Sequence, residues 1–394
     1  MVAVLCATEI TSWGVLFYAF PVLVTSIHDD EGWSVTSLFG AFTVAQLIAA
    51  GVGIWVGRRI DTHGPRGVMT AGSVVGVVAT VAIASAPTLP TFFLAWAVAG
   101  LAMSATLYAP AFAAVTGWAG TDARARVRGL TAVTLVAGFS STLFAPLTAL
   151  LLDRTDWRGT YLVLVVVLAA TVPAHWFGLR PPWTPLAPAA EEAHDPADAP
   201  VSWRSAEFLL LTLAVTLAGF TVFASIVNLV PLLTQHGLST TAAAVALGVS
   251  GAGQVAGRLL YGPLLTRLTI RRRTLVAFGS VAVTTAALAV VQSPLVAVLA
   301  LAFVAGSARG IYTLIQATSV SDRWGITGYG VRNGIVSGAV MAATALAPYA
   351  GAVLAAALGD YAAAFLGLAA ATVVSLVIVA VSDRPRPSPP APRR

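Results

Sequence analysis

Long apolar runs separated by short polar segments dominate the chain. Each run has roughly 18 to 25 residues, and a helix of that length crosses a hydrocarbon layer of about 30 Å. Such runs recur about twelve times, centred near residues 15, 45, 77, 100, 140, 170, 219, 252, 282, 307, 341 and 371. The pattern predicts an all-α membrane protein with twelve transmembrane helices.

The first two runs define the expected boundaries at the start of the chain. The first helix is expected over about residues 2–27, ending in the acidic turn His28–Glu31, and the second over about residues 34–56. The first run follows Met1 directly, without a basic segment or a small-residue cleavage site. We therefore expect a retained helix and no signal peptide.

The composition changes once inside the chain. Residues 181–204 are rich in proline, alanine and acid, which cannot bury a core, so a flexible cytoplasmic linker is expected there. The linker separates two expected six-helix bundles, residues 1–180 and residues 205–381. Residues 382–394 are proline-rich and are expected to form a disordered tail.

The two halves share a weak internal similarity. Shifting the sequence by 205 residues places Gly57 on Gly262, and a shift of 206 places Gly100 on Gly306. Identities that keep their order at a nearly constant offset are typical of a duplicated bundle. The sequence therefore predicts two pseudo-symmetric bundles packed face to face.

Composition and charge fit a membrane protein with a defined orientation. Hydrophobic residues make up 58% of the chain, charged residues only 10%, and the mean hydropathy is +0.86, which excludes a water-soluble domain. All 22 basic residues are arginine, and most lie in loops on the side of residues 57–66, whereas Arg154 and Arg158 lie on the opposite side. The positive-inside rule places residues 57–66 and both termini in the cytoplasm, in a multi-pass protein of the cell inner membrane. The arginines thus indicate topology rather than nucleic-acid binding, and the single Cys6 excludes an internal disulfide.

A short motif between the second and third runs resembles a known family signature. The chain reads Gly57-x-x-x-Asp61-x-x-Gly64-x-Arg66, which is similar to the G-x-x-x-D-R-x-G-R-R loop of the major facilitator superfamily. The resemblance implies that fold, with these four residues as a conformational latch between the halves that favours the outward-open state. Thr62 stands where the family usually has arginine, which suggests a weaker latch. The alternative is that Asp61 is a solvated loop charge.

A second resemblance concerns the branch within the superfamily. The tripeptide Gly32–Ser34 and the spacing Arg258-x-x-x-Gly262 are similar to those of monocarboxylate carriers and oxalate/formate exchangers. In those carriers the arginine places a cation for a carboxylate. They often have an aspartate one turn earlier, where this chain has Gln254. The difference leaves open whether Arg258 binds substrate and whether the same proton coupling applies.

Charged residues inside apolar runs are the strongest site candidates. A charge within the bilayer costs roughly 3 to more than 10 kcal/mol, so an ionisable group there is a functional candidate by default. Arg309 is expected near the midplane and is the leading candidate for substrate binding; the alternative is a structural arginine satisfied by carbonyls and an acid. Arg258 is a second substrate candidate, or part of a gate. Glu9 is the candidate for proton coupling; the alternative is that it pairs with an arginine.

Polar residues on several runs extend the candidate site. One polar stripe facing water or ligand is predicted after Arg309, formed at helical spacing by Tyr312, Thr313, Gln316 and Ser319. Further candidates for ligand contact are amides and phenols in other runs, namely Tyr18, Gln46, Tyr108, Asn228, Gln254 and Asn333. For each of these, the alternative is a hydrogen bond between helices.

These features favour a secondary active transporter. Guanidinium groups suit carboxylates, so the expected substrate is a small organic anion resembling a monocarboxylate. It would move by alternating access around a site between the bundles, with a proton or in exchange for a counter-substrate. The sequence contains no metal-ligand cluster, nucleophile motif or phosphate loop, so neither an enzyme nor a cofactor is expected.

Two other functions stay open at this point. The first is efflux of drug-like amphipathic compounds, although exporters of the superfamily usually have a GP-x-x-GG pattern in the fifth helix, which the stretch Phe144–Ala149 lacks. The second is a membrane receptor on a transporter scaffold. The linker and the tail are too short for a folded signalling domain, which argues against a receptor.

Overall fold

The computed structural model describes residues 1–120, 122–180, 182–183, 204–324 and 329–382, and its regular structure over these residues is helical. Twelve helical spans within this part of the chain are long and apolar enough to cross a membrane. Each expected centre lies inside one of these spans, so the prediction of an all-α protein with twelve transmembrane helices is confirmed. Most of the expected linker, and the expected tail beyond residue 382, lie outside the described residues.

The first six spans come from the first half of the chain. Their segments are α1 (Val2–Trp13), the π-helical η1 (Gly14–Tyr18), α2 (Ala19–Glu31), α3 (Val35–His63), α4 (Pro65–Ala84), α5 (Leu89–Thr106), α6 (Tyr108–Ala119), α7 (Ala123–Gly138), α8 (Ser140–Leu152), α9 (Trp157–Ala169) and α10 (Thr171–Gly178). Several spans contain more than one segment: α1, η1 and α2 form one, and α5 with α6, α7 with α8 and α9 with α10 form three others.

The second half supplies the other six spans. Its segments are α11 (Ala206–Val227), α12 (Leu229–Gln235), α13 (Thr240–Arg267), α14 (Ile270–Val290), α15 (Leu295–Thr318), α16 (Ser321–Trp324), α17 (Tyr329–Leu358) and α18 (Tyr361–Ser382). The short α12 extends α11 beyond the predicted membrane span, and α16 follows α15 at its end.

The first two spans are longer than the sequence suggested. The first continues through the acidic residues to Glu31, because the chain leaves the helix only at Gly32, whose φ of 70° favours glycine. The second continues to His63 rather than ending near residue 56, and it stops at Gly64, with φ of 81°, before Pro65 opens α4. Most of the signature motif is therefore helical: residues 57–63 end α3, Gly64 forms the turn, and Pro65 and Arg66 begin α4.

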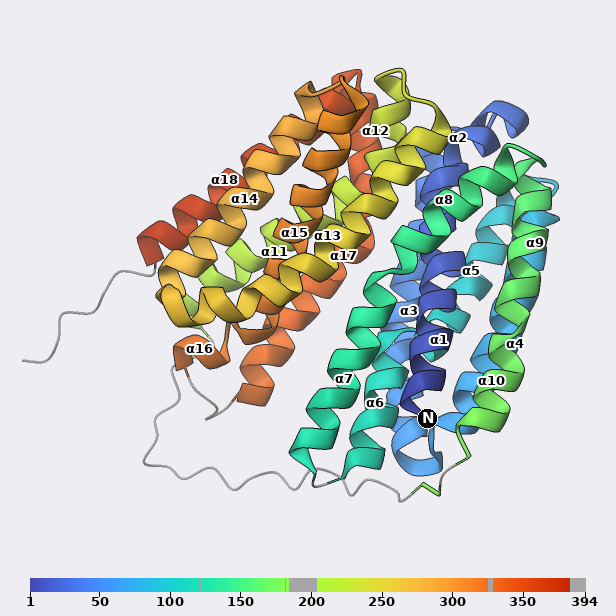
Figure 1. Cartoon of the computed structure of the whole chain (residues 1–394), viewed down its shortest axis with the longest axis horizontal. Helices are drawn as coiled ribbons and strands as arrows, with labels where there is room; N and C mark the ends of the chain where they lie inside the picture. Colours follow the sequence, from blue (N-terminus) through green and yellow to red (C-terminus); the bar gives the residue numbers. More distant parts are fainter. Residues whose placement is uncertain (121, 181, 184–203, 325–328, 383–394) are drawn as a thin grey trace, which may run out of the picture.

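The two halves form separate bundles that meet at one end (Figure 1). Segments α1 to α10 pack together, and segments α11 to α18 form the second group. Contact between the groups runs through α8 with α13, α3 with α17 and α2 with α12, and α7 also touches α13. From the end where α2, α8 and α12 lie, the bundles diverge toward the end where the N-terminus and the start of α7 lie. We call this second end the motif side, because residues 57–66 lie there.

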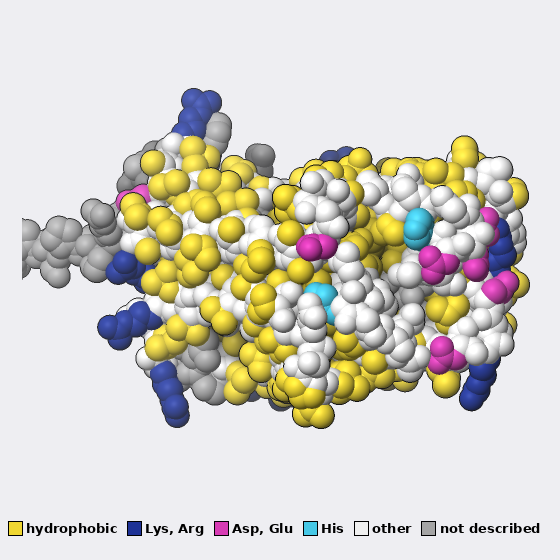
Figure 2. All heavy atoms as spheres, turned by 90° about the horizontal axis from the view of Figure 1, so that it is seen from above, with side chains coloured by type: hydrophobic (Ala, Val, Ile, Leu, Met, Phe, Trp, Pro, Cys, Tyr) yellow, Lys and Arg dark blue, Asp and Glu magenta, His cyan; other side chains and the backbone are white. Residues whose placement is uncertain are grey.

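The outer surface suits a lipid environment. Figure 2 views the molecule from the end where α2, α8 and α12 lie; apolar side chains are spread over this face too, and the arginine side chains lie mainly at its edges. Large apolar residues point outward from several spans, among them Val296 at 74% exposure and Val166 at 72%. In water such a surface would be unfavourable, whereas hydrocarbon chains cover it without loss.

Backbone contact between α13 and α15 organises the interior of the second bundle. A Cβ atom at Gly306 of α15 would overlap the carbonyl oxygen of Ser250 on α13, and one at Gly310 would overlap that of Gln254. Glycines on α13 make the reciprocal contacts with carbonyls of α15. Only residues without a side chain allow two helices to approach this closely. The pair α13–α15 therefore fixes the relative position of every side chain that it carries.

Candidate functional site

The close approach of α13 and α15 places Arg309 against α13. Its Nη2 donates a hydrogen bond of 3.2 Å to Gln254 Oε1 and makes a longer contact of 3.5 Å with the carbonyl oxygen of Ser250. The side chain is buried, with 7% of the residue exposed, and Nε has no partner among the described residues. A full positive charge is thus held inside the protein by two weak contacts to neutral groups.

A second arginine lies close to the first and reaches across to the other bundle. Arg258, one turn after Gln254 on α13, donates a hydrogen bond of 2.7 Å from Nη1 to the carbonyl oxygen of Thr134 on α7. It interacts electrostatically with both Arg309 and Tyr108. Two guanidinium groups therefore lie in one region at the interface of the bundles. Because the two positive charges repel each other inside the protein, an anion that binds near them is stabilised.

The first bundle contributes aromatic residues to the same region. Trp13, at the end of α1, has its ring centroid 4.9 Å from that of Tyr108 and 6.4 Å from that of Tyr18. The π-helical turn Gly14–Tyr18 separates Trp13 from Tyr18 along the span, and such turns often occur at functional sites. Tyr18 and Tyr108 both interact electrostatically with Arg309. The structure thus brings these two predicted site residues together with the arginines.

Glu9 is buried deep in the first bundle beside this cluster. Its Oε2 accepts a hydrogen bond of 3.1 Å from Trp13 Nε1, while Oε1 has no partner within the described part of the chain. It interacts electrostatically with Tyr108. The ion pairs found among the described residues are Arg158–Glu31 and Arg273–Asp322, so in this structure Glu9 does not pair with an arginine. A buried carboxyl group without a cation is suited to holding a proton.

Within the described part of the chain, three other predicted residues make no hydrogen bond to either arginine. Tyr312 is fully buried against α11, where its hydroxyl donates 2.8 Å to the carbonyl oxygen of Val215. Asn228 is buried at the junction of α11 and α12 and donates to the carbonyl oxygen of Ala224 in its own helix. Gln316 is half-buried, about two turns after Arg309 on α15. The stripe expected from Arg309 to Ser319 is therefore not one face, because Tyr312 packs into the bundle core.

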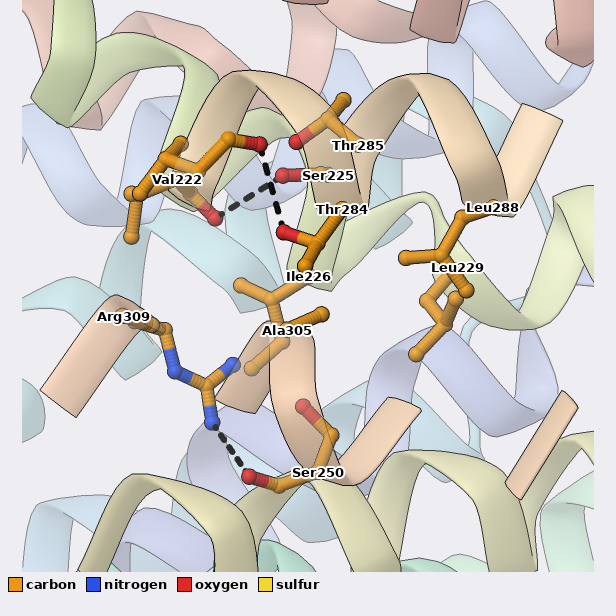
Figure 3. Close-up of a pocket in the computed structure, with 11 residues that line it drawn as sticks. Val222, Ser225, Ile226, Leu229, Ser250, Thr284, Thr285, Leu288, Ala305 and Arg309 are labelled. Carbon is orange, nitrogen blue, oxygen red and sulfur yellow. Dashed lines mark hydrogen bonds between the residues drawn. The ribbon is translucent and has the colours of Figure 1, made fainter. Parts of the chain in front are cut away.

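Behind Arg309 the structure contains a small cavity inside the second bundle (Figure 3). It lies between α11, α13, α14 and α15, and its volume is about 30 Å³. Its polar lining consists of Arg309 and four hydroxyl side chains, those of Ser225, Ser250, Thr284 and Thr285. Sequence reasoning missed these hydroxyls. A serine or threonine in a transmembrane helix commonly bonds to its own backbone, so its residue type alone gives no signal.

The signature motif contacts the first bundle and Trp183, one of the described residues at the start of the expected linker. Arg66 donates 2.9 Å from Nε to the carbonyl oxygen of Trp176 and lies 4.0 Å above that ring. The carbonyl oxygen of Asp61 accepts 3.1 Å from the indole of Trp183. Asp61 is half-buried in the last turn of α3, before Gly64, and Gly57 lies two turns from the end of the same helix. Within the described residues, the Asp61 carboxylate has no hydrogen bond or ion pair to the second bundle.

Metal binding has no evident site in this part of the molecule. The described residues contain no group of three or more His, Cys, Asp or Glu side chains that could hold an ion.

The fold and its interfacial polar cluster define a membrane transporter built from two helical bundles. Residues 2–328 match the Major Facilitator Superfamily, and the chain belongs to that family. Both the resemblance drawn from the motif and the expected fold are thereby confirmed. The family and the fold indicate a multi-pass transporter rather than an enzyme.

Individual relatives are more distant. "Monocarboxylate transporter 11" of Homo sapiens is 29% identical over 246 residues, which are 62% of this chain and 50% of that protein. The match therefore spans about half the length of the relative. Two solved structures of the nucleoside transporter NupG, one of them a mutant, are similar with TM-scores of 0.74 and 0.72 at 13% identity. They cover 97% and 98% of this chain and 99% and 98% of their own, and at that identity the likeness shows the fold alone.

Proposed function

We propose that the protein is a secondary active transporter for a small organic anion that resembles a monocarboxylate. The observation that carries this proposal is Arg309, a buried cation at the bundle interface for which no carboxylate partner exists among the described residues. Arg258 adds a second guanidinium close by. Burying an unpaired charge is unfavourable, so the binding of an anion relieves an existing cost.

The surroundings of the arginines support a carboxylate as that anion. A guanidinium group binds a carboxylate through two parallel hydrogen bonds, and Arg309 has donors that are not used in the present contacts. Tyr18, Tyr108 and Gln254 supply further polar groups around the same region. A relative named as a monocarboxylate transporter agrees with this substrate class.

Alternating access is the expected mechanism of movement. In this structure the bundles touch at the end where α8 meets α13 and diverge toward the motif side. If the arginine distribution places the motif side in the cytoplasm, as we propose for the inner membrane, this conformation faces inward. The motif residues Gly57, Asp61, Gly64 and Arg66 would then act as a latch in the opposite, outward-facing conformation.

Coupling to protons would involve Glu9. Its carboxyl group is buried, lacks an ion pair with arginine, and lies within electrostatic range of Tyr108 beside the arginines. An anion that binds at the arginines would change the field at Glu9 and so favour uptake of a proton. Exchange of one anion for another, without net proton movement, is the other coupling mode that the same site allows.

Uptake by proteoliposomes tests the proposal. The purified protein is reconstituted and offered acetate, pyruvate and lactate, then nucleosides and cationic amphipaths, with and without a pH gradient. We expect uptake of at least one monocarboxylate, lost in Arg309→Gln and kept in Arg154→Gln, a control that removes an exposed arginine far from the site. Movement of cationic amphipaths or nucleosides alone would overturn the anion assignment. Absence of any transport, with ligand binding intact, would favour a receptor.

A further inference from the structure

The cavity behind Arg309 has the composition of an anion site of its own. Arg309 points toward it, and Nη2 makes both of the contacts that this side chain has with the described residues. Nε is buried and has no partner in the part of the chain that the structure describes. The residue is more than nine-tenths buried, so bulk water does not satisfy this donor freely.

The hydroxyl groups around the cavity fall into two kinds. Thr284 donates to the carbonyl oxygen of Ser280 at 2.7 Å, and Ser225 donates to the carbonyl oxygen of Thr221, so both hydrogens are already used within a helix. Ser250 and Thr285 have no side-chain hydrogen bond to any described residue, although both are buried. Their O–H groups are free to donate into the cavity. Free donors, rather than free acceptors, distinguish an anion site from a cation site.

The size of the cavity limits what can occupy it. A volume of about 30 Å³ holds about two water molecules, which is also the scale of a halide ion or a single carboxylate group. The rest of the lining is aliphatic, from residues such as Val222, Ile226 and Leu288. A larger organic molecule does not fit entirely inside, and a cation would face the charge of Arg309 directly.

We propose that this cavity binds one compact monovalent anionic group, held by Arg309, Ser250 and Thr285. The group is either a free halide ion or the carboxylate end of the transported anion, and the second source rests on the function proposed above. With the site filled, the buried charge of Arg309 is neutralised inside the second bundle. The α13–α15 backbone contact keeps Ser250 and Arg309 at a fixed separation, so the site is preformed.

The test is thermal unfolding of the purified full-length protein as a function of anion concentration. Sodium chloride or sodium formate replaces sodium methanesulfonate at constant ionic strength, since a sulfonate group is larger than the halide or carboxylate that the cavity would hold. For the filled site we expect a saturable rise in Tm, because the anion binds only the folded state. If chloride raises Tm in the absence of any carboxylate, the occupant is a free ion. If formate raises Tm and chloride does not, the occupant is the carboxylate group of the transported anion.

Two neighbouring threonines provide a matched pair of variants. Thr285→Val removes a free donor and should raise the half-saturating anion concentration at least about tenfold, the usual effect of losing one hydrogen bond to a charge. Thr284→Val removes a hydroxyl that already donates to Ser280 and should leave that concentration within about twofold. Ser250→Ala should act like Thr285→Val, which guards against a folding defect in one variant.

Failure of this inference is separate from failure of the proposed function. If no anion shifts Tm, or if the shift is equal in the Thr285 and Thr284 variants, the cavity does not bind an anion and the inference is wrong. Uptake of monocarboxylates is measured independently in proteoliposomes. Uptake without any anion effect on Tm would mean that only the cavity inference is wrong. An effect of halide on Tm without uptake of monocarboxylates would mean that only the proposed function is wrong.

Discussion

Replacing Gly306 by alanine perturbs the contact on which the candidate site depends. The added Cβ would overlap the carbonyl oxygen of Ser250, and because both atoms are fixed to backbones, neither can rotate away. The helices α13 and α15 must therefore separate. Overpacking of this kind costs about 1–3 kcal/mol, while replacing a helical glycine by alanine recovers about 0.5–1 kcal/mol. We expect a net loss of about 1–2 kcal/mol in the free energy of unfolding.

The assay is chemical denaturation of the purified variant, with monocarboxylate uptake measured in parallel. Uptake should fall as well, because separation of the helices moves Arg309 away from Gln254 and Ser250. The matched control is Gly279→Ala on α14, where an added Cβ meets nothing within 4 Å, so stability should stay equal or rise by about 0.5–1 kcal/mol. If Gly306→Ala is as stable and as active as Gly279→Ala, the α13–α15 contact and the reasoning from it are wrong.

Three further predictions test other parts of the molecule. Arg158→Gln removes the 2.7 Å ion pair with Glu31 and two hydrogen bonds to backbone carbonyls, so the free energy of unfolding should fall by about 1–3 kcal/mol. The control Arg154→Gln should leave the free energy of unfolding unchanged. Equal values for the two variants would contradict the pairing of Arg158 with Glu31. Glu9→Gln keeps the size of the side chain but cannot exchange a proton, so uptake driven by a pH gradient should drop at least about tenfold while anion exchange continues; unaltered gradient-driven uptake would rule out Glu9. Trp183→Ala removes the indole that packs against the turn after α3, so denaturation should show a loss of about 1–3 kcal/mol, and no loss would mean that this packing is absent in solution.

The twelve spans were predictable because hydrophobic length alone determines them. Every run that could cross a bilayer does form a helical span, and the spans of each half lie together in one group of helices (Figure 1). Boundaries were less predictable, since polar residues can continue a helix beyond the apolar run. Glu31 and His63 end their helices only where Gly32 and Gly64 adopt positive φ, and the sequence does not distinguish such a glycine from any other.

The charged part of the site was also accessible from sequence. An arginine in an apolar run is rare and costly, so Arg309 and Arg258 were recognisable without a structure. The structure adds that they lie close together, with Tyr18 and Tyr108 from the other bundle. That proximity depends on packing between helices that are far apart in the chain.

Packing also decided where sequence reasoning failed. Three residues along a helix correspond to a rotation of about 300°, which leaves a side chain about 60° away from the first. That offset suffices for Tyr312 to face α11 while Arg309 faces α13. The hydroxyls of Ser250 and Thr285 became visible only as groups without partners beside a cavity, and no periodicity in the sequence reveals a missing partner.

The central claim is that Arg309 binds the anionic group of the transported substrate. Its most direct test is the dissociation constant of the best-transported monocarboxylate, measured by isothermal titration calorimetry for the unmodified protein, Arg309→Lys and Arg309→Gln. Lysine keeps the charge but loses the forked donor pair, so affinity should fall in that order, with glutamine weaker by at least about tenfold. A dissociation constant for Arg309→Gln equal to that of the unmodified protein would contradict the account.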